Sequence, residues 1–216
     1  MNKQPEKIVY FVRHGQSEAN VSPVFQSPDS PLNETGKNQA QKIAERIAKL
    51  SFETLIASPL ARTKETAEAI TAKTGKQPEY SDLFVERIKP TSLYGKSYED
   101  EKADALWKNW EKSLYTPDLR VEDSENFDDL ISRADKALEF LRTRPEKDLV
   151  VVTHGYFLRT MVARVVLGDT LTPESFRSFH SRVLTENTGL TVIRYEQTWE
   201  GMDWRLWIYN DHAHLG

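Results

Sequence analysis

The chain has 216 residues and no cysteine, so we expect a single domain over residues 1–216 and neither a disulfide framework nor thiolate chemistry. Its formal net charge is -4, which leaves no global basic field to recruit nucleic acid. Because residues 1–7 lack the apolar core of a signal peptide and no later apolar run approaches a membrane span, we expect a cytoplasmic protein without a membrane partner.

The first predicted element is a buried strand at residues 9–12. Four apolar residues in a row are typical of a strand that is covered on both faces inside a parallel sheet. The run stops abruptly at Arg13, His14 and Gly15, which we therefore place at the carboxyl end of the strand. Ligands bind at that edge of open α/β sheets, and a glycine there lets the backbone turn sharply and approach a ligand.

The next stretch, residues 22–33, is rich in proline and serine and predicts a loop. Apolar residues recur at helical spacing over residues 40–50, which predicts an amphipathic helix packed on the sheet. A short strand is expected at residues 55–57, with Ser58 as the N-cap of a second helix. Arg62 falls in the first turn of that helix, where a cation opposes the helix dipole and indicates a bound anion nearby.

Residues 83–86 are another short apolar run, which predicts a strand that ends at Glu86. Residues 88–123 are a possible cap segment, in which a helix beginning near residue 98 carries two tryptophans that could cover a pocket. An amphipathic helix is expected next, with Ser124 as its N-cap.

A second strand of the same kind as the first is predicted at residues 148–153, again a short apolar run that ends in His154 and Gly155. A buried helix follows over residues 156–167. Two buried strands that each deliver a histidine to one sheet edge form a constellation that packing alone does not require. The sequence therefore indicates a catalytic site at this edge.

The end of the chain predicts an edge hairpin, from strand-like runs at residues 190–195 and 204–209. Strands and helices alternate along the rest of the sequence. This alternation predicts an α/β fold, a three-layer α/β/α sandwich with a mostly parallel central sheet.

Four sequence blocks resemble those of the histidine phosphatase superfamily, the group that includes the cofactor-dependent phosphoglycerate mutases. The blocks are residues 13–20 (RHGQSEAN), 31–40 (PLNETGKNQA), 58–67 (SPLARTKETA) and 153–155 (THG). They occur in the family's order and are spread over most of the chain. The resemblance implies a phosphoglycerate mutase-like fold and an active site at the carboxyl edge of the sheet.

The residues at this edge suit an attack on a phosphomonoester. Its phosphoryl oxygens are negative, so a site has to neutralise that charge and align a nucleophile with the leaving oxygen. Arg13 and Arg62 offer planar forks for the phosphoryl oxygens, and His154 adds a further donor. His14, as a neutral imidazole with one nitrogen held as N–H by a backbone carbonyl, is the expected nucleophile, and the intermediate is a phosphohistidine.

Glu86 is the best positional match to the family's proton donor. It would protonate the leaving alkoxide and then act as base for the hydrolytic water. Three residues, Gln16, Asn20 and Gly155, are expected to bind substrate. We expect neither a cofactor nor a metal, because the arginines supply the positive charge that magnesium supplies elsewhere.

The predicted function is a metal-independent phosphomonoesterase that acts on a small phosphorylated metabolite. A phosphoglycerate mutase would use the same residues, but mutases carry a tryptophan-glutamate-glycine segment where this chain has residues 88–97 (IKPTSLYGKS). The sequence is also compatible with a phosphoprotein phosphatase and with a non-catalytic phospholigand-binding module. It leaves the substrate and the oligomeric state open.

Other histidines invite further interpretations. Asp211, His212 and His214 could suggest a zinc site, but the sequence shows no closed ligand set, so no metal is predicted there. His180 and Arg182, placed just after the last helix, could reach a substrate, although nothing in their spacing requires it.

Overall fold

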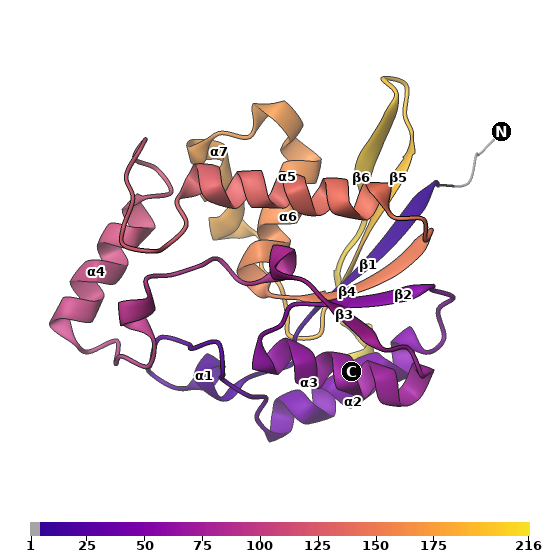
Figure 1. The fold of residues 1–216 in the computed structure, drawn as a ribbon, viewed down its shortest axis with the longest axis horizontal. Coiled ribbons are helices and arrows are strands. Elements are labelled where there is room, and N and C mark those ends of the chain that lie inside the picture. The colour runs from indigo at the N-terminus through magenta and orange to yellow at the C-terminus, as the bar shows by residue number, and fades with distance from the viewer. Residues whose placement is uncertain (1–4) are drawn as a thin grey trace.

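A six-stranded sheet forms the middle of the protein in the computed structural model, which describes residues 5–216; residues 1–4 of the polar N-terminal segment lie outside the described residues. The strands are β1 (Lys7–Arg13), β2 (Thr54–Ala57), β3 (Pro78–Tyr80), β4 (Asp148–Thr153), β5 (Leu190–Gln197) and β6 (Met202–Asp211). They lie in the order β3-β2-β4-β1-β5-β6 (Figure 1). The first four strands in that order run parallel, and β5 is antiparallel to both β1 and β6. The predicted mostly parallel sheet and the edge hairpin are confirmed.

Helices cover both faces of the sheet (Figure 1). The helices are α1 (Glu18–Val21), α2 (Glu34–Ile47), α3 (Ala61–Thr74), α4 (Glu101–Lys112), α5 (Phe127–Thr143), α6 (Gly155–Leu167) and α7 (Pro173–Arg182). The pair α2 and α3 lies on one face, and α5 and α6 lie on the other, with α7 against α6. This arrangement confirms the predicted three-layer α/β/α sandwich.

Two apolar cores hold the layers together, and β1 contributes to both. Val9 and Phe11 belong to the cluster under α5 and α6, whereas Val12 belongs to the cluster under α2 and α3. Successive side chains of a strand point to opposite faces, so a continuous apolar run is what a strand covered on both sides needs.

The register of β1 on β4 brings the two histidine motifs together. The two strands are parallel neighbours, and Arg13 pairs with Thr153. His14 and His154 are each the next residue, so both leave the sheet at the same edge. Their rings meet edge to face with 5.1 Å between centroids.

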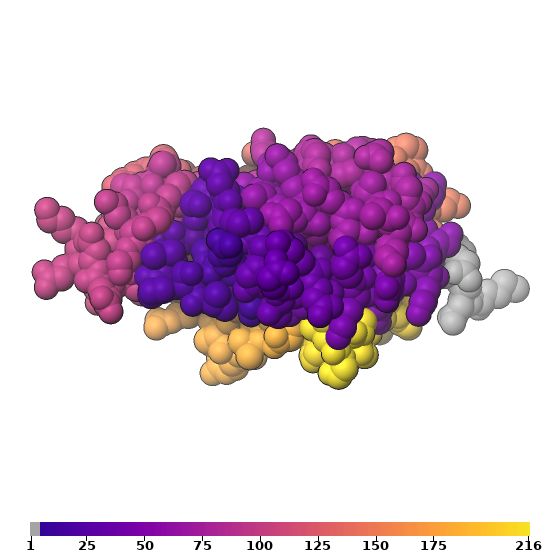
Figure 2. All heavy atoms as spheres, turned by 90° about the horizontal axis from the view of Figure 1, so that it is seen from below, coloured from indigo at the N-terminus to yellow at the C-terminus, as the bar shows by residue number. Residues whose placement is uncertain are grey.

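The possible cap segment, residues 88–123, extends away from the sandwich, and its two ends lie close together. At its base, the N–H of Glu125 donates to the carbonyl of Ile88 at 2.9 Å. The N–H of Phe25, in the loop after α1, donates to the carbonyl of Lys96 at 2.9 Å. In Figure 2 the pink segment with α4 lies at one end of the molecule, beside the indigo loop. Its function as a cap, and the single domain, remain predictions.

The predicted strand at residues 83–86 is wrong. The structure has a 3₁₀ helix, Asp82–Phe84, followed by extended chain, and the strand in this region is β3, which was not predicted. The Ser81 side chain accepts from the Leu83 N–H and starts the 3₁₀ turn. The carbonyl of Phe84 accepts from the Thr153 hydroxyl, 2.8 Å away, so side chains take the place of a neighbouring strand.

Two predicted helix caps also differ. Helix α3 begins at Ala61 with Leu60 as N-cap, while the hydroxyl of Ser58 is engaged by His154. Helix α5 is capped by Asn126, not Ser124, because Asn126 forms a reciprocal capping box with Asp129. Arg62 is nevertheless in the first turn of α3, as predicted.

No helix within residues 5–216 is long and apolar enough to cross a membrane.

Candidate active site

His14 lies at the end of β1 and is 2% exposed. Its Nδ1 is 2.7 Å from the carbonyl oxygen of Gly15, which can only accept, so Nδ1 carries the proton. Its Nε2 accepts a hydrogen bond from Nε of Arg62 at 3.2 Å. Burial, with the charges of Arg62 and Arg13, holds the pKa of His14 well below its usual range. The side chain is therefore a neutral imidazole whose Nε2 lone pair faces a guanidinium.

Gly15 is required by packing against α2. A Cβ added at Gly15 would lie 2.4 Å from the carbonyl oxygen of Gly36, and one at Gly36 would lie 1.9 Å from the carbonyl oxygen of Gln16. The two glycines belong to the first and second sequence blocks. Their close approach fixes the turn that carries His14 against the start of α2.

His154 is the N-cap residue of α6 and is fully buried. Its Nε2 lies 2.8 Å from the Ser58 hydroxyl, at the end of β2. Burial, with the charges of Arg62 and His14, holds the pKa of His154 well below its usual range. Its Nδ1 is buried and has no hydrogen-bond partner within residues 5–216. A ligand atom is the natural partner for such a nitrogen.

Arg62 enters the site from the first turn of α3 and is 2% exposed. Besides the bond to His14, its Nη1 donates to the carbonyl of Ser27 at 3.3 Å. Burial lowers the pKa of Arg62 to about 10, so it stays a cation at neutral pH. The positive charge predicted at this position is thus buried beside the imidazole.

Arg13 lies across the start of α6. Its Nη1 donates to the carbonyl of Thr185, and its buried Nε has no partner within residues 5–216. A Cβ on Gly155 would lie 2.9 Å from that Nε. Gly155 therefore makes room for Arg13. Burial lowers the pKa of Arg13, and an arginine side chain is not deprotonated in proteins.

Glu86 is bound at the N-terminus of α6. The N–H groups of Phe157 and Arg87 donate to its Oε1 at 2.9 and 3.1 Å, and the N–H of Tyr156 donates to Oε2 at 3.2 Å. The N–H groups of Tyr156 and Phe157 have no partner within the helix, so the carboxyl oxygens satisfy them and are held in place. Helix α6 thus places the carboxyl group close to its own N-cap residue, His154.

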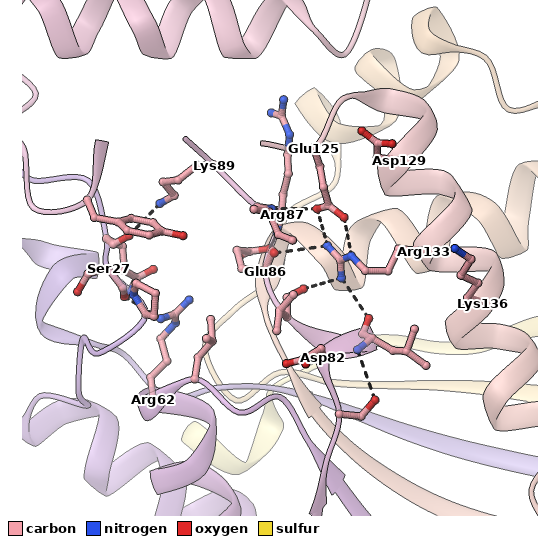
Figure 3. A pocket seen from close by; sticks show the side chains of 18 of the residues that line it. Ser27, Arg62, Asp82, Glu86, Arg87, Lys89, Glu125, Asp129, Arg133 and Lys136 are labelled. Carbon is pink, nitrogen blue, oxygen red and sulfur yellow. Dashed lines mark hydrogen bonds and ion pairs between the residues drawn. The ribbon is translucent and has the colours of Figure 1, made fainter. Parts of the chain in front are cut away.

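An ion pair holds the segment that carries Glu86 (Figure 3). Nε of Arg133 lies 2.7 Å from the Glu125 carboxylate, and both side chains are mostly buried. Nη1 of Arg133 also donates to the carbonyls of Leu83 and Val85, at 3.1 and 2.9 Å. The Glu125 carboxylate in turn accepts from the N–H of Ile88 at 2.9 Å. The sequence offered no periodic signal for this pair, because it joins two loops and a helix distant in the chain.

A cavity of about 850 Å³ opens beside Arg62 and Glu86. Arg62 points into it from α3, with Lys89 and Ser27 on one side and Arg133 on the other (Figure 3). Arg62 both lines the cavity and contacts His14, so it connects the cavity to the imidazole.

The two predicted neutral contacts are engaged elsewhere in this structure. The Gln16 side chain accepts from Asn33 at 2.8 Å. The Asn20 side chain accepts from the N–H of Ser17 at 2.9 Å as part of the capping box of α1, and the residue is exposed. Neither contact involves His14 or Arg62, and substrate binding by Gln16 and Asn20 stays a prediction.

The remaining histidines lie in contacts of their own. His180 and Arg182 belong to α7 itself, and the His180 ring packs against Tyr156 with 4.1 Å between centroids. His214 Nε2 lies 3.1 Å from the Thr188 hydroxyl, and Asp211 pairs with Arg46.

His212 lies next to a backbone carbonyl: its Nδ1 is 2.9 Å from the carbonyl of Asn210. Within residues 5–216 no three His, Cys, Asp or Glu side chains gather in a way that could hold a metal ion.

Sequence reasoning missed Asn187 and Thr188. Nδ2 of Asn187 donates to the carbonyl of His14 at 2.9 Å, and the N–H of Thr188 donates to the carbonyl of Arg13 at 3.0 Å. Thr188 has a positive φ of 58°, which is unusual for a β-branched residue and marks a strained turn at the site. No local pattern around residue 187 distinguishes it from an ordinary turn before β5.

The chain is similar to known proteins along most of its length. The family model of the histidine phosphatase superfamily (branch 1) matches residues 9–210. The chain is similar to the probable phosphoglycerate mutase GpmB of Photorhabdus laumondii subsp. laumondii, with 32% identity over 216 residues that cover 96% of this chain and 94% of that protein.

Two solved structures share its fold. YhfR of Bacillus stearothermophilus has a TM-score of 0.78 and 24% identity, and the match covers 97% of this chain and 100% of that one. The phosphoserine phosphatase of Entamoeba histolytica, solved in complex with 3-phosphoglyceric acid, has a TM-score of 0.73 and 22% identity, with coverage of 97% and 99%.

These likenesses confirm the predicted phosphoglycerate mutase-like fold. Membership of the family is shown by two findings. The family model spans most of the chain, and a relative is 32% identical over nearly all of it. The protein belongs to branch 1 of the histidine phosphatase superfamily.

Proposed function

We propose that the protein is a metal-independent phosphomonoesterase that works through a phosphohistidine on His14. The observation that carries this proposal is the state of the imidazole. The Nδ1–H group donates to the carbonyl of Gly15. Nε2 carries no proton, and its lone pair faces Arg62. A neutral imidazole fixed in this tautomer is a nucleophile, and the guanidinium in front of it is where a phosphoryl group would be bound.

The first step forms the phosphoenzyme. A phosphoryl oxygen takes the hydrogen bond that Arg62 gives to His14, which frees Nε2 to attack phosphorus. The P–O bond to the leaving group breaks as the N–P bond forms, and Glu86, which starts the cycle protonated, gives its proton to the leaving oxygen. The buried Nε of Arg13 and Nδ1 of His154, both without partners within residues 5–216, are available to the other phosphoryl oxygens.

The second step returns the free enzyme. Glu86 takes a proton from a water molecule, whose oxygen attacks phosphorus as the N–P bond breaks. The products are inorganic phosphate and neutral His14. The two arginines supply the positive charge for both steps, so the mechanism needs no metal ion.

Hydrolysis is favoured over mutase chemistry by the cavity. A mutase has to keep water from its phosphohistidine, whereas this site opens into about 850 Å³ beside the proposed proton donor. Residues 88–97 also lack the tryptophan-glutamate-glycine segment of mutases. With a phosphoglycerate as substrate, we expect release of inorganic phosphate without isomerisation; isomerisation faster than phosphate release would favour the mutase.

The nucleophile is tested with His14→Ala. We expect this variant to lose turnover on a model phosphomonoester and to form no phosphoenzyme, which can be trapped in the wild type by quenching in alkali, where phosphohistidine survives. Thermal unfolding checks that the variant is folded. A folded His14→Ala protein with wild-type turnover would refute the assignment.

The charge cluster is tested with anions and a chelator. Vanadate or inorganic phosphate should inhibit competitively, because Arg13 and Arg62 are built to hold a phosphoryl group. A chelator should leave turnover unchanged. Loss of turnover on chelation, with recovery on adding zinc or magnesium, would show that the metal-independent mechanism is wrong.

A further inference from the structure

A second chamber of about 450 Å³ adjoins the catalytic cavity. Four residues line both spaces: Gln26, Glu86, Arg87 and Lys89. The second chamber is otherwise walled mainly by aromatic rings, those of Phe25, Tyr98, Trp107, Trp110 and Tyr156. We call this space the aromatic chamber.

Two charged groups of the aromatic chamber are already paired. Arg87 lies 2.6 Å from the Glu111 carboxylate and is stacked 3.7 Å from the centre of the Trp110 ring. Asp104 lies 2.6 Å from Nζ of Lys108. Two polar groups remain: Nε of Arg87 is buried without a partner within residues 5–216, and Nζ of Lys89 donates to the carbonyl of Gln26 at 3.1 Å. Both residues also line the catalytic cavity, so on the side away from that cavity the chamber offers mainly rings to a ligand.

The rings differ in how firmly they are held. Trp110 is buried, and its Nε1–H donates to the carbonyl of Glu125 at 3.3 Å. Phe25 and Tyr98 pack edge to face with 4.7 Å between centroids. Tyr98 and Trp107 remain 50% and 37% exposed, although they stand beside a catalytic cavity. Large exposed rings in such a place mark a surface that a ligand covers.

Glu86 connects this chamber to the chemistry. In the proposed function it protonates the leaving oxygen, so the group attached to that oxygen starts at Glu86, and Glu86 lines the aromatic chamber. We propose that the aromatic chamber is the leaving-group subsite and that it selects phosphomonoesters with an apolar, aromatic-sized alcohol. The proposal rests on the proposed phosphatase function, which it extends to a substrate class.

The test compares two esters whose leaving alcohols have similar acidity. Phenethyl phosphate and ethyl phosphate differ by one phenyl group, so a difference in kcat/KM reports binding of the ring and not leaving-group chemistry. For the wild type we expect phenethyl phosphate to be favoured by about tenfold or more, the usual discrimination for burying an apolar group of this size.

The aromatic wall is tested with Trp107→Ala, which should bring the ratio of the two kcat/KM values toward one. The matched control is Trp199→Ala, which removes a tryptophan that is 97% exposed in the turn between β5 and β6 and should keep the wild-type ratio. Equal kcat/KM for the two esters in the wild type, or an unchanged ratio in a folded Trp107→Ala, would overturn the subsite alone. If the wild type hydrolysed neither of the two esters, the proposed function would be overturned, and the subsite with it.

Discussion

His14 and Glu86 owe their positions to backbone atoms. The carbonyl of Gly15 fixes the His14 ring, and the N–H groups at the start of α6 fix the Glu86 carboxyl group. Backbone groups move little when nearby side chains are replaced. Substitutions at these two positions should therefore report the lost chemical group more than a rearranged site.

Replacing Glu86 should affect poor leaving groups most. An alkoxide needs protonation as it leaves and nitrophenolate needs much less, so Glu86→Gln should lower turnover of an alkyl phosphate by about 10²–10⁴-fold and that of nitrophenyl phosphate far less. Arg62→Ala should lower both, because both transition states carry the phosphoryl charge. The measurement is kcat for both variants on both esters, after single-turnover experiments show that phosphoenzyme formation limits the rate.

Equal losses on the two esters for Glu86→Gln would argue against general acid catalysis by this residue. Asp82 would then be the next carboxylate to replace, since it also lines the catalytic cavity. Glu18, the other carboxylate close to the nucleophile in sequence, is exposed on α1.

Gly155→Ala should separate phosphate binding from stability. The added Cβ would lie 2.9 Å from Nε of Arg13, so Arg13 has to move away from its place over α6. The variant would lose the charge-assisted hydrogen bond that we propose between Arg13 and the phosphoryl group. We therefore expect the inhibition constant of inorganic phosphate to rise about tenfold or more. Alanine favours a helix over glycine, so the unfolding midpoint should not fall. A variant with unchanged phosphate inhibition would show that Arg13 does not bind the phosphoryl group.

The loop from residue 83 to 88 depends on one ion pair instead of on a strand partner. Arg133→Met would leave the buried Glu125 carboxylate without its cation, and we expect it to lower the free energy of unfolding by about 3–5 kcal/mol. Because Arg133 also binds the carbonyls around Glu86, turnover should fall more on the alkyl than on the aryl phosphate. Urea unfolding measures the change in stability, and kcat on the alkyl and the aryl phosphate measures the change in turnover.

Arg142→Met is the matched control for this element. Arg142 pairs with Glu139 on the same helix, but both side chains are exposed, so the substitution should leave unfolding and turnover close to wild type. If Arg133→Met lost turnover equally on both esters, the pair would support the fold without positioning Glu86.

The elements that the sequence predicted well are those with a clear hydrophobic pattern. Strands β1 and β4 read as continuous apolar runs, and α2 and α5 show helical spacing, because the two cores fix these patterns. The predictions for the α3 cap and for the segment before Glu86 were wrong because distant side chains set the conformation: His154 contacts Ser58, and Arg133 and Thr153 bind carbonyls of the segment. The prediction for the α5 cap was wrong for a local reason, because Asn126 and Asp129 form the capping box.

For the site, the sequence identified candidate histidines and arginines, and the structure showed which groups contact them. The histidine and arginine positions could be predicted because each follows a recognisable strand or starts a helix. The binding of Glu86 at α6 and the meeting of Phe25 with Tyr98 depend on two loops coming together across the molecule. No spacing within either loop contains that information.

Buried histidines make the whole molecule sensitive to acid. Four of the five histidines have pKa values below the usual 6.5: His14 and His154 well below, His180 at about 3 and His214 at about 4, in each case mainly through burial. As the pH falls below 6.5 the unfolded chain takes up protons that the folded chain does not. Stability is therefore greatest above that pH and declines below it.

His180 tests this dependence away from the reacting groups. Its ring packs between Tyr156 and Phe176, and its folded pKa of about 3 against 6.5 when unfolded defines a window between these values. In the middle of that window one extra proton on the unfolded chain costs about 1.4 kcal/mol per pH unit. His180→Phe removes this proton, so the free energy of unfolding in urea should fall less steeply between pH 6 and 4, by about that slope. His212→Gln, at an exposed position, is the control and should keep the wild-type slope. If His180→Phe also had the wild-type slope, His180 would be protonated in the folded protein as readily as in the unfolded chain.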